Sequence, residues 1–143
     1  MIDRTAFRRA IESHDFDPLI GLFCEDAVLH SPITSQPFEG KAAIRHLLAI
    51  IFEVFQDFHY TDEFDAADGM TKALVLFFRA RVGNRDAAGG VKCRDAAGVD
   101  LIRLADEGMV RDLTVMVRPR SSTEALLAEV PPRLLASLRA DAR

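Results

Sequence analysis

The segment GVDLIRLADEGMVRDLTVMVR, residues 98–118, decides the fold of this chain. Two runs in it, Val99–Leu104 and Met109–Arg118, are rich in aliphatic residues, and a short polar stretch ending in Gly108 separates them. This pattern predicts two antiparallel strands joined by a hairpin. Because side chains alternate along a strand, Asp100 shares a face with Ile102 and Leu104. One carboxyl group is therefore expected on an otherwise apolar face.

Two more strands are expected upstream, at Phe58–Phe64 and Thr71–Val82, with an Asp- and Gly-rich turn between them. In the second strand, alternation separates Phe78 from Arg79 and Arg81. We expect Phe78 on the inner face of the sheet and both arginines on the outer face.

Helical patterns precede these strands. Two short helices are expected at Phe7–His14 and Leu19–Cys24, a short strand at Ala27–His30, and a long helix beginning at Gly40. The long helix has apolar residues at helical spacing on one face: Ile44, Leu47, Leu48, Ile51, Phe52 and Phe55. Helices followed by an antiparallel meander predict an α+β domain with the helices packed on one face of the sheet.

We expect residues 1–120 to form the main domain and residues 121–143 a C-terminal helical tail. Pro131-Pro132 is expected to interrupt that helix, because proline removes a backbone donor and clashes with the preceding turn. The pentapeptide Arg85–Gly89 recurs as Arg94–Gly98. We interpret the repeat as a local duplication that lengthens one exposed, mobile hairpin.

Composition narrows the function classes. The chain has 143 residues, a net charge of −4 and a pI near 5.5, so it lacks the basic patch that nucleic-acid binding requires. No stretch reaches the ~20 apolar residues of a membrane span. Two cysteines without metal-ligand spacing predict reduced thiols in a cytoplasmic protein, with no metal site and no cofactor. Ten Phe, one Tyr and no Trp suit a large dry interior.

Several pieces of the chain, in their order and spacing, resemble the nuclear transport factor 2-like superfamily, in its SnoaL-like branch. The pieces are Phe7…Ala10-Ile11…Asp15, Leu22-Phe23…Glu25–Val28…Ser31-Pro32, Gly40–Ile44, Phe55…Asp57-Phe58…Tyr60, and residues 98–119. The resemblance implies a cone: a strongly curved antiparallel or mixed sheet of cystatin-like topology that encloses a pocket with three N-terminal helices. It also implies a homodimer formed through the outer sheet face.

Steroid isomerases of this superfamily provide a pattern that can be compared residue by residue. The resemblance places their general-base Asp at Ser31, their oxyanion-hole Tyr at Phe7, and their protonated carboxylic acid at Asp100. In those isomerases an apolar site raises the pKa of this acid, which therefore stays neutral and donates a hydrogen bond. Neither a serine hydroxyl nor a phenyl ring can perform the first two roles at neutral pH. Only Asp100, placed inward by the resemblance, stays a catalytic candidate.

The expected site is therefore an apolar pocket with few polar groups, where Tyr60 could supply the hydroxyl that Phe7 lacks. Its expected ligand-binding residues are Phe7, Ile11, Phe23, His30, Ser31, Leu48, Phe52, Phe55, Tyr60, Phe78, Asp100, Val115 and Val117. Three functions are open. The first is binding of a small hydrophobic molecule, the second is an isomerase or cyclase that uses Asp100 as acid or base, and the third is a dimerisation domain whose interior is filled.

Overall fold

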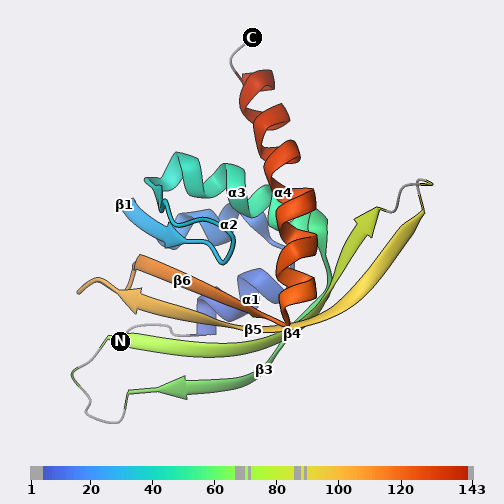
Figure 1. Ribbon diagram of the computed structural model, residues 1–143. Helices are drawn as coiled ribbons and strands as arrows, with labels where there is room; N and C mark the ends of the chain where they lie inside the picture. The colour runs from blue at the N-terminus through green and yellow to red at the C-terminus, as the bar shows by residue number, and fades with distance from the viewer. Residues whose placement is uncertain (1–4, 67–69, 71, 86–87, 89, 142–143) are drawn as a thin grey trace.

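The computed structural model describes residues 5–66, 70, 72–85, 88 and 90–141 (Figure 1). Four helices and six strands follow one another along these residues: α1 Thr5–Glu12, α2 Phe16–Gly21, β1 Phe23–His30, β2 Phe38–Glu39, α3 Lys41–Val54, β3 Phe55–Asp65, β4 Ala73–Arg85, β5 Val91–Leu104, β6 Val110–Arg118 and α4 Arg120–Asp141. The order confirms the α+β class expected from the sequence.

The strands form one mixed sheet in the order β2-β1-β6-β5-β4-β3. All neighbouring strands are antiparallel except β1 and β6, which are parallel. Parallel neighbours need a long crossover, and here it comprises α3 and the β3–β5 meander. This crossover brings the amino-terminal strand next to the last one.

The inner face of the sheet is apolar. Along β4 the side chains of Leu74, Leu76 and Phe78 are buried, whereas the alternate Phe77 and Arg79 are exposed. The helices lie over the inner face, with α3 above β1 and β3 and with α4 rising across β4 and β6 (Figure 1). The core fills the space between these two layers.

The sheet is not strongly curled, which corrects the expected cone. Strands β4 and β5 pair without a register shift from Ala73↔Arg103 to Arg85↔Val91. Bulges are the usual cause of sharp bending in a strand pair, and this pair of long strands has none, although the β1–β6, β3–β4 and β5–β6 pairs each have a register shift. The interior is closed instead by the helices, including α4 (Figure 1).

Helix α4 continues through Pro131 and Pro132, contrary to the expected break. The carbonyls that lose a donor are those of Leu127 and Ala128, four residues earlier, and both residues are exposed to water. On the amino-terminal side Ala125, Leu126 and Val130 are buried, and beyond the prolines Leu134 packs against the core. We attribute the unbroken helix to packing on both sides of the proline pair.

Two smaller expectations also change. The second helix ends at Gly21 and not at Cys24, and β1 starts at Phe23 and not at Ala27. The early start of β1 comes from pairing with β6: the Val110 amide donates to the Leu22 carbonyl, and Phe23 pairs with Val110. The second copy of the repeated pentapeptide, Arg94–Gly98, belongs to β5 of the long β4–β5 hairpin, but it is not wholly exposed, because Ala96 is buried. The first copy, Arg85–Gly89, lies partly outside the described residues.

Gly98 is a close-packing position in this sheet. A Cβ atom added there would overlap the backbone carbonyl oxygen of Met116 and the ring of Phe78. We predict that Gly98→Ala destabilises the protein by at least about 2 kcal/mol, the range of overpacked cores. Urea unfolding followed by circular dichroism measures the change.

Gly21→Ala is the matched control, because a Cβ at Gly21 has open space around it. Its effect should stay within about 0.5 kcal/mol, as for ordinary surface substitutions. Equal stability of the two variants would show that β5 and β6 separate easily at Gly98.

Candidate functional site

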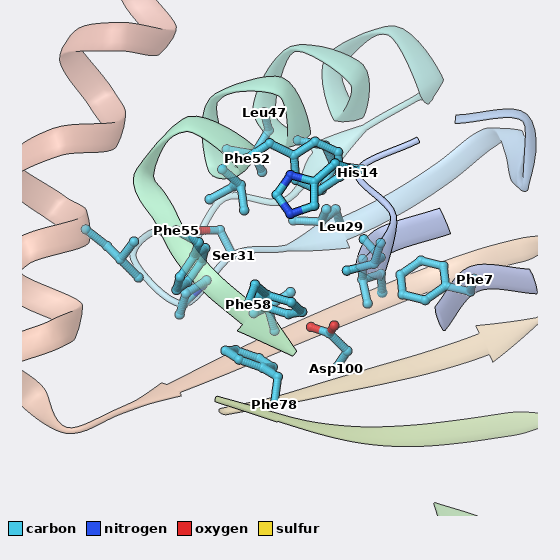
Figure 2. Close-up of a pocket in the computed structure, with 17 residues that line it drawn as sticks. Phe7, His14, Leu29, Ser31, Leu47, Phe52, Phe55, Phe58, Phe78 and Asp100 are labelled. Atoms are coloured by element: carbon cyan, nitrogen blue, oxygen red, sulfur yellow. The ribbon is translucent and has the colours of Figure 1, made fainter. Parts of the chain in front are cut away.

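A cavity of about 70 Å³ lies between the inner sheet face and the helices (Figure 2). Its wall is apolar except for Asp100, Ser31 and His14. The full lining is Phe7, Ile11, His14, Leu29, Ser31, Pro32, Leu47, Leu48, Ile51, Phe52, Phe55, Phe58, Phe78, Asp100, Leu113, Val115 and Leu126. The cavity is smaller than the roughly 300–1,000 Å³ of common ligand pockets, so it suits a compact molecule.

Three phenylalanines form the wall beside Asp100. Phe58 stacks on Phe78 with ring centroids 4.6 Å apart, and Phe55 meets both rings edge to face. Phe55 and Phe58 are three residues apart and would face opposite sides of a regular strand. Both face inward because the β3–β4 register shifts between Gln56 and His59, where Asp57 has a φ of 52°. This irregularity also orients Tyr60 inward.

Asp100 is the buried polar group of the cavity. It lies on β5 opposite Leu76 of β4 and Val115 of β6, and its side chain is only 6% exposed. Burial raises the pKa of Asp100 from 3.8 to about 7, while a hydrogen bond from Tyr60 lowers the pKa. The charged carboxylate is disfavoured because the surrounding side chains cannot replace its hydration. Near neutral pH Asp100 therefore exists in both protonation states.

Tyr60 is the hydrogen-bond partner of Asp100. Its hydroxyl donates to Asp100 Oδ2 at 2.6 Å, a short distance typical of a hydroxyl bound to a carboxylate. Burial, followed by the charge of Asp100, raises the pKa of Tyr60 well above 10, so the phenol keeps its proton. This proton is committed to Asp100, and Tyr60 itself does not line the cavity. Tyr60 acts on the cavity through Asp100.

The structure brings most of the expected site residues together. Phe7, Ile11, Ser31, Leu48, Phe52, Phe55, Phe78, Asp100 and Val115 all line the cavity. Phe23 is fully buried behind Phe7, in an edge-to-face contact at 6.2 Å, and Val117 packs against the core without reaching the cavity.

His30 and Ser31 differ in position. The His30 side chain is 44% exposed and its Nε2 lies 3.0 Å from Asp112 Oδ2, so it does not line the cavity. Ser31 does line it, but its Oγ accepts a hydrogen bond from the Ile33 amide at 3.2 Å. Such a local bond is the usual function of serine in a turn.

The site expected from the sequence did not include eight of the lining residues: His14, Leu29, Pro32, Leu47, Ile51, Phe58, Leu113 and Leu126. Phe58 could have been found, because it shares strand alternation with Tyr60. Leu126 could not, because only tertiary packing brings α4 over the cavity. His14 directly follows α1, and a histidine at the C-terminal end of a helix is already explained by a favourable interaction with the helix dipole, so it gave no signal of a cavity.

The described residues contain no group of three or more His, Cys, Asp or Glu side chains that could hold a metal ion. None of the described helices is both long and apolar enough to span a membrane. Both cysteines are free thiols in the structure.

An α+β sheet with helices over one face and an internal apolar cavity defines the structural class, and comparison with known proteins identifies the family. Residues 4–112 match the model of the SnoaL-like domain. The chain therefore belongs to the SnoaL-like family of the nuclear transport factor 2-like superfamily, which confirms the resemblance seen in the sequence. No curated protein matched the chain.

Solved structures agree with this assignment. A steroid delta-isomerase from Pseudomonas aeruginosa is 33% identical with a TM-score of 0.76, and the match covers 96% of this chain and 97% of that one. An uncharacterised protein with a cystatin-like fold from Silicibacter pomeroyi DSS-3 is 25% identical with a TM-score of 0.75, over 97% and 86% of the two chains. A provisionally named polyketide cyclase from Pseudomonas putida KT2440 shares the fold at 14% identity, with a TM-score of 0.67 over 85% and 92%.

The raised pKa of Asp100 predicts a specific pH dependence of stability. Between about pH 4 and pH 7 the native state keeps a proton that the unfolded state releases. The free energy of unfolding should therefore fall as pH rises through this range, by up to about 4 kcal/mol for a shift of some three pH units. Asp100→Asn removes the titration and keeps an acceptor for Tyr60, so the variant should become more stable relative to wild type as pH rises.

Urea unfolding at several pH values between 4 and 8 measures the difference between the two proteins. Carbon-detected NMR of the Asp100 carboxyl gives its midpoint directly. A midpoint near the unperturbed value of about 3.9 would contradict the prediction.

Proposed function

We propose that the cavity binds a compact hydrophobic molecule and orients it through one carbonyl or hydroxyl oxygen at Asp100. The single observation that carries the proposal is a buried carboxyl group with a pKa of about 7 inside an apolar cavity. Tyr60 bonds one carboxyl oxygen of Asp100, so the O–H of the neutral acid is left as a donor inside an apolar wall, and a ligand oxygen can accept a hydrogen bond from it. Apolar walls with a few convergent polar groups are typical of small-molecule sites.

Size limits the ligand class. Engineered cavities of ~150 Å³ bind benzene, whereas this cavity measures about 70 Å³. A six-membered ring therefore enters only if the partly buried Ile51 and Phe52 move aside. A four-ring steroid, such as the substrates that the isomerase's name implies, would require a much larger opening.

Two isosteric ligands test the proposal: cyclohexanone and methylenecyclohexane differ only in the oxygen. At pH 5.5 neutral Asp100 can donate to the ketone, and wild type should bind cyclohexanone about fivefold more tightly, the worth of one hydrogen bond. At pH 8.5 the carboxylate cannot donate, and the preference should fall. Dissociation constants from NMR titrations give both ratios.

Two variants of the same residue provide the controls. Asp100→Asn carries an amide donor at every pH, so its preference for the ketone should persist at pH 8.5. Asp100→Leu has no carboxyl group to titrate, so its preference for the ketone should be smaller than that of wild type at pH 5.5 and should not fall at pH 8.5. A preference in Asp100→Leu that equals that of wild type at both pH values would exclude Asp100 as the contact. If neither ligand binds wild type, the cavity is only a gap in the packing of the core, and the alternative of a dimerisation domain is favoured.

A second candidate function is proton transfer to and from carbon, with Asp100 as acid or base. A pKa near the working pH is the optimum for this chemistry, and Asp100 has one. The cyclohexanone samples, prepared in D₂O, test the idea through exchange of the hydrogens next to the carbonyl. An acid–base enzyme should accelerate this exchange over buffer, and Asp100→Asn should reduce it at least about 100-fold. Buffer-level exchange with tight binding would identify a binding protein.

We also propose that the outer sheet face pairs with a second copy of the chain. Phe77 is 42% exposed and Met116 57% exposed on this face, and Phe77 contacts the exposed Phe64. Arg79 and Arg81 flank them on β4, as the sequence predicted. Phe77→Asp should shift sedimentation towards the monomer. Leu138→Asp, at an exposed position of α4, should not, and equal effects of both variants would contradict this interface.

A further inference from the structure

His14 occupies a backbone position that disfavours its own side chain. Helix α1 ends in a Schellman motif, in which the Asp15 amide donates to the Ala10 carbonyl at 3.0 Å and the His14 amide to the Ile11 carbonyl at 3.2 Å. His14 is the residue in the left-handed conformation, with a φ of 56°.

Glycine is the usual residue at such a position, because it has no Cβ to crowd the following carbonyl. A side chain there lowers the stability of the helix end, although histidine tolerates it better than most residues. The motif itself therefore gives no reason for an imidazole. Strained residues gather at functional sites, and the surroundings of His14 determine whether this is one.

The His14 ring lies at the cavity. It stacks on Phe52, with ring centroids 5.5 Å apart and an angle of 27°, and it lines the cavity on the side opposite Asp100 (Figure 2). Among the residues that the structure describes, neither ring nitrogen has a hydrogen-bond partner. By contrast His30, His46 and His59 each have one. His14 is exposed, so its nitrogens are open to water at the edge of the cavity, and an oriented imidazole there is suited to bind a ligand.

We propose that His14 is the second polar contact of the cavity, so that the ligand carries hydrogen-bonding groups at two opposite ends. One oxygen lies at Asp100, against the sheet, and the other polar group lies at His14, on the helical side. The stack on Phe52 holds the ring in place. This inference rests on the proposed binding function and narrows the ligand class from a monofunctional ring to a compact bifunctional one.

Cyclohexanone and 1,4-cyclohexanedione test the inference, because they share a ring and differ by one carbonyl at the opposite end. Two equivalent carbonyls alone favour the dione by a statistical factor of about 2, and a further hydrogen bond adds about fivefold. Wild type at pH 5.5 should therefore bind the dione about tenfold more tightly. In His14→Gly the ratio should fall to about 2, while the affinity for cyclohexanone and its dependence on pH persist.

Stability provides a second readout, because a purely structural histidine would behave in the opposite way. His14→Gly relieves the left-handed strain, so its urea midpoint should equal or exceed that of wild type while the preference for the dione is lost. His14→Asn also tolerates the conformation and should likewise lose the preference. His30→Ala removes a histidine outside the cavity and should leave the ratio near ten.

The outcomes separate the two proposals. An unchanged ratio in both His14 variants, or a ratio near 2 in wild type, would overturn the role of His14 and leave the ketone contact at Asp100 standing. Failure of wild type to bind either ketone would overturn the binding function itself. A lower urea midpoint of His14→Gly, together with an unchanged ratio, would identify His14 as a structural residue only.

Discussion

Alternation of side chains across the paired strands β4 and β5 is the constraint on which the interior of this protein depends. The two strands pair without a register shift, so their side chains alternate between the two faces without interruption. Phe78 and Asp100 therefore lie on the inner face, and Phe77 and Arg79 lie on the outer face. A slip by one residue would expose the core and carry the carboxyl to solvent. Gly98 strengthens this register, because the Phe78 ring packs where a larger residue would have its Cβ.

The hydrogen bond between Tyr60 and Asp100 also depends on side-chain alternation, in this case along β3. Asp57 interrupts the alternation of β3, and as a result Phe55, Phe58 and Tyr60 all reach the interior. The phenylalanines keep water from Asp100, while the Tyr60 hydroxyl supplies one hydrogen bond to it. Burial raises the pKa of Asp100 and the hydrogen bond from Tyr60 lowers it, and the effect of burial is the larger one. Burial thus makes Asp100 titrate near neutral pH, at a cost to stability that grows with pH.

The helices determine the size and opening of the cavity. Because the sheet is not strongly curled, α1, α3 and α4 provide the walls that a cone would have provided. Leu126 of α4 reaches the cavity because the part of the helix before its two prolines packs on the core, where Ala125 and Val130 are also buried. The residue at the helical side, His14, comes from the end of α1, so the two polar contacts of the site belong to different layers of the fold.

The sequence by itself determined the α+β class, the family, the inner face of the hairpin at residues 98–118 and the position of Asp100 on it. The class and the face that Asp100 shares with Ile102 and Leu104 follow from local periodicity, which a strand or helix expresses whatever surrounds it, whereas the family and the inward orientation of that face follow from the resemblance. It also named Tyr60 as a hydroxyl for the site, and the structure places this hydroxyl on Asp100 rather than in the cavity.

Only the tertiary structure decided the rest. The inward turn of Phe58, the stretch of helix beyond Pro131-Pro132, the outward position of His30 and the stacking of His14 on Phe52 depend on contacts between segments distant in sequence. The sheet is also less strongly curled than the family resemblance implies, because bulges bend strand pairs and none is present between the long strands β4 and β5. Local pattern specifies which face a residue prefers, whereas the volume and shape of the cavity are set by how the layers pack.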